Sequence, residues 1–201
     1  TMLALLWWLS QRSVVQDSPQ PILTVHLKPQ VLIGLILLSV QLTLGALTSA
    51  WFAGPACPEL TACSGAKWSL SAINIFRELN VNGQGKILNA GTAEMIHIAH
   101  RLVAIILAAY LLWLGFKIIA YKDRLRATGL TLLGLLGLQL VLGLLSIAMQ
   151  LPLLMVTAHN AVAAILLLTT INLYHLLIPL TRMTSSDDQR EIGRASCRER
   201  V

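Results

Sequence analysis

Four long apolar runs constrain the fold of this 201-residue chain more than any other feature. Each run is nearly free of charge and long enough to cross a hydrocarbon core, which takes about 20 helical residues. The runs are residues 31–52, 96–114, 130–149 and 151–178. At 56% hydrophobic and 12% charged residues, the chain carries more apolar surface than a soluble domain of this length needs for its core. The sequence therefore predicts an all-α, polytopic membrane four-helix bundle.

Both ends of the chain differ from this pattern. Residues 2–9 are apolar with no charged segment before them, so they are typical of the end of a preceding transmembrane helix and not of a signal peptide. Residues 191–201 (EIGRASCRERV) resemble translated sequencing-adapter read-through, and we leave them out of the predicted fold. Without them, Cys57 and Cys63 are the only cysteines.

Basic residues are shared unevenly between the two sides of the predicted membrane. One side carries Arg12, Lys28, Lys117, Lys122, Arg124, Arg126, Arg182 and Arg190, and the other only Lys67, Arg77 and Lys86. The positive-inside bias makes the first side cytoplasmic and turns loop 53–91 to the periplasm or its organellar equivalent. We therefore expect a multi-pass protein of the bacterial inner membrane, or of the mitochondrial inner membrane in a eukaryote, surrounded by lipid. The net charge of +6 reflects this topology and not nucleic-acid binding.

The order of segments follows from the spans and their orientation. The turn near residues 150–152 is so short that the last two helices form an antiparallel hairpin, with Pro152 in the first turn of the last helix. The predicted segments are 1–10 (end of a preceding transmembrane helix), 11–30 (cytoplasmic loop), 31–180 (four-helix unit with extracytoplasmic loop 53–91), 181–190 (cytoplasmic tail) and 191–201 (non-native read-through).

Two histidines inside the predicted spans are the main functional candidates. Polar side chains within a span are costly and usually face the bundle interior, beside a partner or a ligand. If their helices begin near Gly91 and Pro152, His100 and His159 each lie about 10 to 14 Å below the extracytoplasmic boundary. Two imidazoles at one depth on different helices can fill both axial positions of a haem iron. The alternative is an interhelical hydrogen bond. We expect no ligand role for His26, in a cytoplasmic segment, or for His175, near the cytoplasmic end of the last helix.

Small residues accompany the histidine pair at helical spacing. They leave room for the edge of a porphyrin, but they also occur where membrane helices simply pack closely, so both interpretations stay open. These residues are Ala104, Ala108 and Ala163 beside the histidines, and Gly134, Gly137 and Gly143 in the intervening helix.

Arg101 stands next to His100, and a guanidinium within a span needs an anion. A haem propionate would serve, and Glu94 near the helix start is the structural alternative. His97 lies one turn before His100, and the sequence leaves three roles open for it: a donor to another side chain, a propionate contact or an interfacial residue.

Three runs together resemble the second half of the haem A synthase family: MIHIAHRLVA (95–104), AHNAVAAILLLT (158–169) and ACPELTACSG (56–65). In that family, two similar four-helix halves each hold a histidine pair on their second and fourth helices. The resemblance, which extends to about Leu180, implies that His100 and His159 ligate a haem b. It also carries the family's cysteine pair onto Cys57 and Cys63, which we expect to form a disulfide on the oxidising side of the membrane, with two free thiols as the alternative.

The resemblance also implies an activity. In the family's first half a glutamate implicated in the oxidation stands three residues before the ligand histidine, and here His97 occupies that position. We therefore place the chain in the second half and name no catalytic residue. The whole protein would oxidise a methyl group of its substrate, haem O, to a formyl group, giving haem A for terminal oxidases, with haem O synthase as a candidate partner.

A bis-histidine iron has no open position for oxygen, so this half would carry electrons. Two rival functions are retained. The chain would otherwise be a free-standing bis-histidine membrane b-type cytochrome for electron transfer, or a scaffold protein in which the histidines only join helices.

Overall fold

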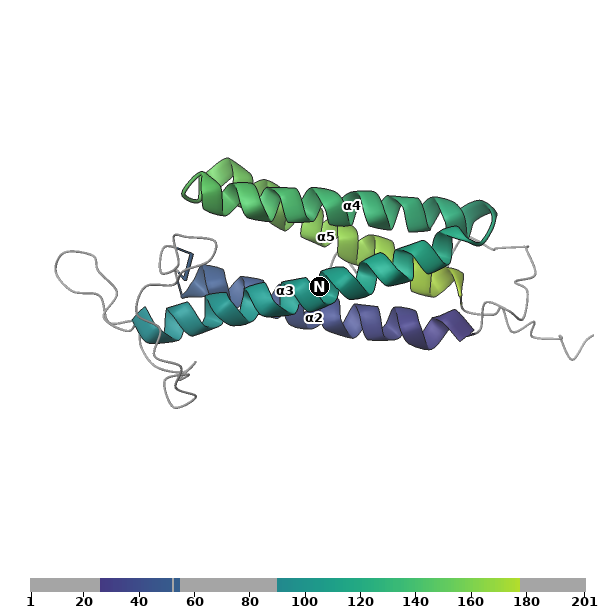
Figure 1. Ribbon diagram of the computed structural model, residues 1–201, viewed down its shortest axis with the longest axis horizontal. Helices are drawn as coiled ribbons and strands as arrows, with labels where there is room; N and C mark the ends of the chain where they lie inside the picture. The colour runs from purple at the N-terminus through teal and green to yellow at the C-terminus, as the bar shows by residue number, and fades with distance from the viewer. Residues whose placement is uncertain (1–25, 52, 55–89, 178–201) are drawn as a thin grey trace, which may run out of the picture.

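The computed structural model describes residues 26–51, 53–54 and 90–177 of the chain. Four α-helices make up nearly all of these residues, and no strand occurs among them (Figure 1). They are α2 (Lys28–Ala50), α3 (Ala90–Ile119), α4 (Asp123–Ala148) and α5 (Leu153–Leu176). All four are long and apolar enough to span a membrane. The prediction of an all-α, polytopic helical bundle is confirmed.

Helices α2, α3 and α4 begin before the apolar runs that predicted them. Helix α3 has 30 residues and begins at Ala90, well before the run at 96–114. The polar residues Glu94, just before the run, and His97, within it, both belong to this helix. Helix α4 likewise begins at Asp123 and not at residue 130, because Arg124 and Arg126 are good helix formers. Hydropathy therefore located the spans but missed their polar end turns.

The turn between α4 and α5 forms the predicted antiparallel hairpin. Gln150 and Leu151 close the turn with positive φ angles of 60° and 64°. Pro152 is the N-cap of α5, and its carbonyl oxygen accepts the backbone N–H of Met155 at 3.0 Å. Helix α5 thus begins at Leu153, just after the proline, and the expectation that Pro152 lies within the first turn was off by one residue.

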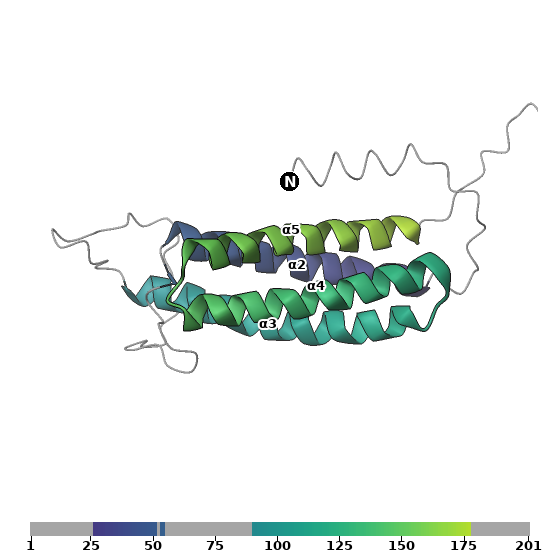
Figure 2. The same cartoon turned by 90° about the horizontal axis from the view of Figure 1, so that it is seen from above.

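The four helices pack in a ring in chain order. Helix α2 contacts α3, α3 contacts α4, α4 contacts α5, and α5 returns to α2. Figures 1 and 2, related by a 90° turn, show the resulting square arrangement. Consequently α3 and α5 are diagonal neighbours, as are α2 and α4. Large apolar side chains, including Ile105, Phe116 and Leu154, are exposed on the outer faces, as lipid-facing residues would be.

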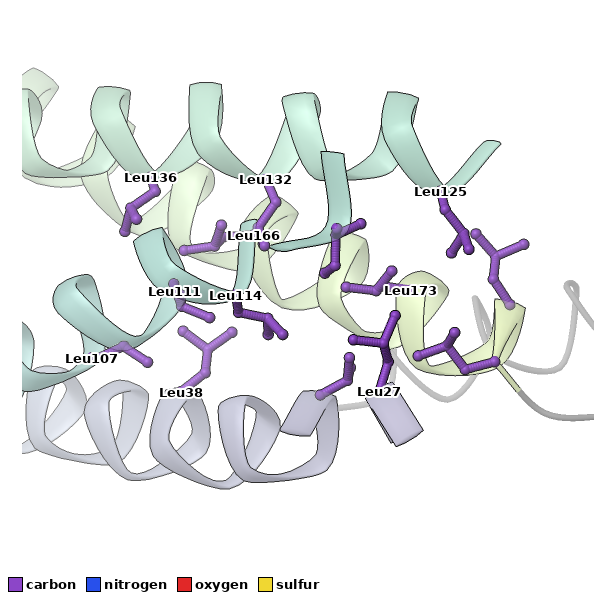
Figure 3. Close-up of a cluster of buried hydrophobic side chains, with 14 of the residues drawn as sticks. Leu27, Leu38, Leu107, Leu111, Leu114, Leu125, Leu132, Leu136, Leu166 and Leu173 are labelled. Atoms are coloured by element: carbon purple, nitrogen blue, oxygen red, sulfur yellow. The ribbon is translucent and has the colours of Figure 1, made fainter. Parts of the chain in front are cut away.

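A leucine cluster fills one end of this bundle (Figure 3). It joins all four helices, because the starts of α2 and α4 meet the ends of α3 and α5 in an antiparallel ring. Toward the middle of the bundle it ends at Leu38, Leu107, Leu136 and Leu166. Its members are Leu27, Val31, Leu38, Leu107, Ala108, Leu111, Leu114, Ile118, Leu125, Leu132, Leu136, Leu166, Leu173, Leu176 and Leu177.

The other end of the bundle is packed differently. The hydrophobic cluster found there within the described ranges consists of Trp51, Ala53, Ala93 and Ile96, which join α3 only to the end of α2 and the residues that follow it. Among the described residues, no hydrophobic cluster shared by all four helices lies beyond the leucine cluster. This is the half of the bundle that contains His100 and His159.

Basic and aromatic side chains gather at the leucine end. Lys117 donates from Nζ to Gln30 Oε1 at 3.0 Å, and the same Nζ lies 5.0 Å from the centre of the Trp113 ring. Tyr110 donates its hydroxyl to the Gln30 carbonyl oxygen at 2.7 Å. Basic and aromatic residues are typical of a membrane interface, and their position agrees with the predicted cytoplasmic side, which itself stays a prediction.

Candidate functional site

His100 and His159 lie on the diagonal helices α3 and α5, immediately beyond the leucine cluster. Each is half-buried, and each stands seven residues before a buried leucine of the cluster, Leu107 or Leu166. The sequence predicted these two imidazoles, on diagonal helices, as the axial ligands of a haem, and that role stays a prediction.

Their depth along the bundle follows from the helix starts. His100 is ten residues after the start of α3 and His159 is six residues after the start of α5, or about 15 and 9 Å at the helical rise. Both helices begin within one residue of the starts that the sequence analysis assumed, Gly91 and Pro152. The matching depth of the two histidines in the membrane stays a prediction.

Helix α2 provides the surface against which His100 lies. Gln41 Nε2 is 3.1 Å from His100 Nδ1 and 3.3 Å from its Nε2, and it also donates to the His100 carbonyl oxygen at 3.1 Å. One turn further along α2, a Cβ on Gly45 would lie only 3.3 Å from His100 Cε1. Gln41 and Gly45 are four residues apart and share a helix face, so together they form one side of the ring's environment.

Helix α4 provides a matching surface for His159. Gln139 Nε2 is 3.0 Å from His159 Nε2. A Cβ on Gly143 would lie 3.1 Å from His159 Cε1, whereas one on Gly134 or Gly137 would meet nothing within 4 Å. The structure therefore distinguishes three glycines that looked equivalent in the sequence, and only Gly143 lies against a candidate ligand.

We call Gln41, His100, Gln139 and His159 the histidine layer.

Three polar atoms of the histidine layer are buried without a hydrogen-bond partner: Gln41 Oε1, Gln139 Oε1 and His159 Nδ1. Each such atom costs about 1–3 kcal/mol, so a cluster of them calls for an explanation. The described residues contain no group of three or more His, Cys, Asp or Glu side chains that could hold a metal ion by themselves. Two imidazoles instead suit a metal that brings its own equatorial ligands, and the residues present fit a haem.

Other predicted residues have different positions. His97 is buried, with Nδ1 3.0 Å from the Ala53 carbonyl oxygen, so it ties α3 to the segment after α2 through a backbone contact that the sequence did not predict. Ala108 and Ala163 are both buried, at 8% exposure. Arg101 is half-buried next to His100, and its contact with a propionate stays a prediction. Cys57 and Cys63 lie outside the described residues, so their disulfide also stays a prediction.

The glycines of α4 provide a matched test of the packing around His159. Gly143→Val should destabilise the protein by about 1–3 kcal/mol, because the new side chain overlaps the imidazole ring. Gly134→Val introduces the same residue in the same helix where a Cβ meets nothing within 4 Å, and it should have little effect. Unfolding in detergent measures both variants. Equal losses would show that valine disturbs α4 itself and that the close contact is not responsible.

Together, the fold and the histidine layer define a class: a multi-pass helical membrane protein with a histidine pair inside a four-helix bundle. The sequence matches the COX15-CtaA family, described as cytochrome oxidase assembly protein, over residues 1–171, and the chain belongs to this family.

One relative extends this result. The heme A synthase of Shewanella oneidensis is 36% identical over 165 residues, which are 80% of this chain and 49% of the relative. The chain therefore spans about half the length of this curated relative. No solved structure matches the chain. The resemblance to the haem A synthase family, stated above on three sequence runs, is confirmed.

Proposed function

We propose that this chain is the haem-binding half of a haem A synthase, with a haem b held between His100 and His159. The observation that carries the proposal is that the two imidazoles lie on diagonal helices, each seven residues before a buried leucine of the leucine cluster. Membership of the cytochrome oxidase assembly family and similarity to a heme A synthase support the same function.

Each residue of the site has a definite role in this proposal. His100 and His159 would hold the iron, and Arg101 would balance the charge of a propionate. The leucine cluster excludes water from the cytoplasmic side of the site. When bound, the haem would supply one-electron redox chemistry. Two histidine ligands would suit electron transfer and not the binding of oxygen.

The proposed activity belongs to the full-length protein, which oxidises a methyl group of haem O to a formyl group and so provides haem A for terminal oxidases. In this proposal, residues 31–180 form the haem-binding unit in the inner membrane. Loop 53–91 faces the extracytoplasmic side, where Cys57 and Cys63 form a disulfide.

The test is expression of the full-length gene in a host that makes haem O but lacks its own synthase. Haem A should accumulate and should be separable from haem O after extraction. The rival function, a free-standing membrane cytochrome, predicts a bound b-type haem and no haem A in the same host. That second result would replace the synthase proposal by the cytochrome.

A further inference from the structure

The two helical hairpins of the bundle repeat each other in sequence. Residues 41–50 (QLTLGALTSA) and 139–148 (QLVLGLLSIA) agree at six of ten positions. Residues 99–107 (AHRLVAIIL) and 158–166 (AHNAVAAIL) agree at six of nine. The first match relates α2 to α4 and the second relates α3 to α5, so the hairpin α2–α3 corresponds to the hairpin α4–α5.

Corresponding residues also occupy corresponding places in the structure. The buried Leu38 and Leu136 each stand three residues before the glutamine of their helix. The second helix of each hairpin, α3 or α5, carries residues of at most 4% exposure at the same spacing. These are Leu107, Leu111, Leu114 and Ile118 in α3, and Leu166, Thr170, Leu173 and Leu177 at the matching positions in and just after α5.

The glutamine-to-histidine contact is part of this repeat. Gln41 and His100 are 59 residues apart in the chain, whereas Gln139 and His159 are only 20 apart, yet each glutamine reaches the imidazole of the following helix at 3.0–3.1 Å. Each glutamine is followed after four residues by a glycine whose surface receives the same ring. The contact between glutamine and histidine therefore does not depend on the length of the loop between the helices. It follows from the geometry that the two hairpins share.

Haem ligation gives these glutamines a specific task. An imidazole that binds iron through one ring nitrogen keeps a proton on the other, and inside a membrane that N–H needs an acceptor. Gln41 Oε1 and Gln139 Oε1 are buried acceptors without a partner, and His159 Nδ1 is a buried ring nitrogen without one. The amide of Gln139 lies beside the other ring nitrogen of His159, with Nε2 to Nε2 at 3.0 Å. The oxygen and nitrogen of a glutamine amide exchange places by rotation of its last torsion, so either amide can present its oxygen to the ring.

We propose that Gln41 and Gln139 are a symmetric pair of positioning residues, each of which accepts the N–H proton of the ring nitrogen that does not bind iron, in His100 and His159 respectively. They fix the two imidazole planes and raise the basicity of both ligands, which sets the reduction potential of the haem. This inference rests on the proposed haem between His100 and His159, and it adds two residues that act through the ligands.

The test uses the haem-loaded chain and the four variants Gln41→Met, Gln139→Met, Gln41→Glu and Gln139→Glu. Methionine keeps the length of the side chain and removes the acceptor, so both methionine variants should remain low-spin with altered EPR g values. The equilibrium between ferric and ferrous haem should shift about tenfold toward the ferrous form, which is a rise of ~59 mV in the reduction potential for one electron. Glutamate keeps an acceptor oxygen, so both glutamate variants should hold the potential at or below that of the unchanged chain.

The repeat itself supplies the controls. Thr43 and Val141 occupy corresponding exposed positions on α2 and α4, so Thr43→Val and Val141→Thr exchange the residues of the two hairpins without touching the histidine layer. Both controls should keep the potential and g values of the unchanged chain. Methionine variants with an unaltered potential and unaltered g values would overturn the inference.

Loss of haem from a methionine variant is also decisive. Haem retained by the glutamate variant at the same position supports the acceptor role, and haem lost from both contradicts it. Failure of the unchanged chain to bind haem would refute the proposed function. A low-spin haem whose potential and g values stay the same in all the glutamine variants would refute the positioning role alone.

Discussion

Replacing either His100 or His159 by alanine is expected to abolish the low-spin haem spectrum of the purified chain. Each imidazole fills one axial position, so its removal leaves the iron five-coordinate and high-spin, or releases the haem. The loss should exceed the 10–100-fold cost in affinity that is typical of an outer-shell partner, because a direct ligand is removed. Optical spectra of equal amounts of protein measure the effect.

Two other histidines are the matched controls. His26 is exposed before α2, and His175 is near the end of α5 at the opposite end of the bundle from the histidine layer. His26→Ala and His175→Ala should therefore leave the low-spin spectrum unchanged. If both His100→Ala and His159→Ala retained the spectrum of the unchanged chain, the ligand assignment would be wrong.

The second large effect concerns activity: residues 1–190 alone should yield no haem A, even when loaded with haem. His100 and His159 close both faces of the iron, so this site has no position for oxygen. The family resemblance places a glutamate implicated in the oxidation three residues before the ligand histidine of the other half. Here that position holds His97, whose ring contacts the Ala53 carbonyl oxygen.

The measurement is haem extraction from the host that makes haem O and lacks its own synthase. The short chain and the full-length gene are expressed in parallel, and haem A should appear only with the full-length gene. Haem A produced by the short chain would show that this half is sufficient for the reaction. The proposed division between an oxidising half and an electron-carrying half would then fail.

The spans were predictable because a hydrocarbon core demands long apolar segments, and four such runs stand out in the sequence. Their ends were less predictable. Arg124 and Arg126 lower the hydropathy of the first turns of α4, yet the helix propensity of arginine is about equal to that of leucine. Neighbouring helices and a membrane interface decide such boundaries, and neither is visible in a sliding average of hydropathy.

The histidine layer was predictable in part. His100 and His159 were conspicuous because polar residues are rare within spans. Gln41 and Gln139 lie within spans too, but they were missed because no motif marks them singly. The repeated Gln-x-x-x-Gly of α2 and α4 was the signal that comparison of the helices with one another would have found. The difference between Gly143 and Gly134 depends on the rotation of α4 about its axis, which only the packed bundle determines.

The most direct test of this account is the haem content and spin state of the purified, unchanged chain. We expect one b-type haem per chain, identified as its pyridine adduct, with the optical and EPR signals of a low-spin iron that two imidazoles ligate. A chain that folds in detergent and binds no haem, or that binds a high-spin haem with an open axial position, would contradict the central claim that His100 and His159 together hold a haem.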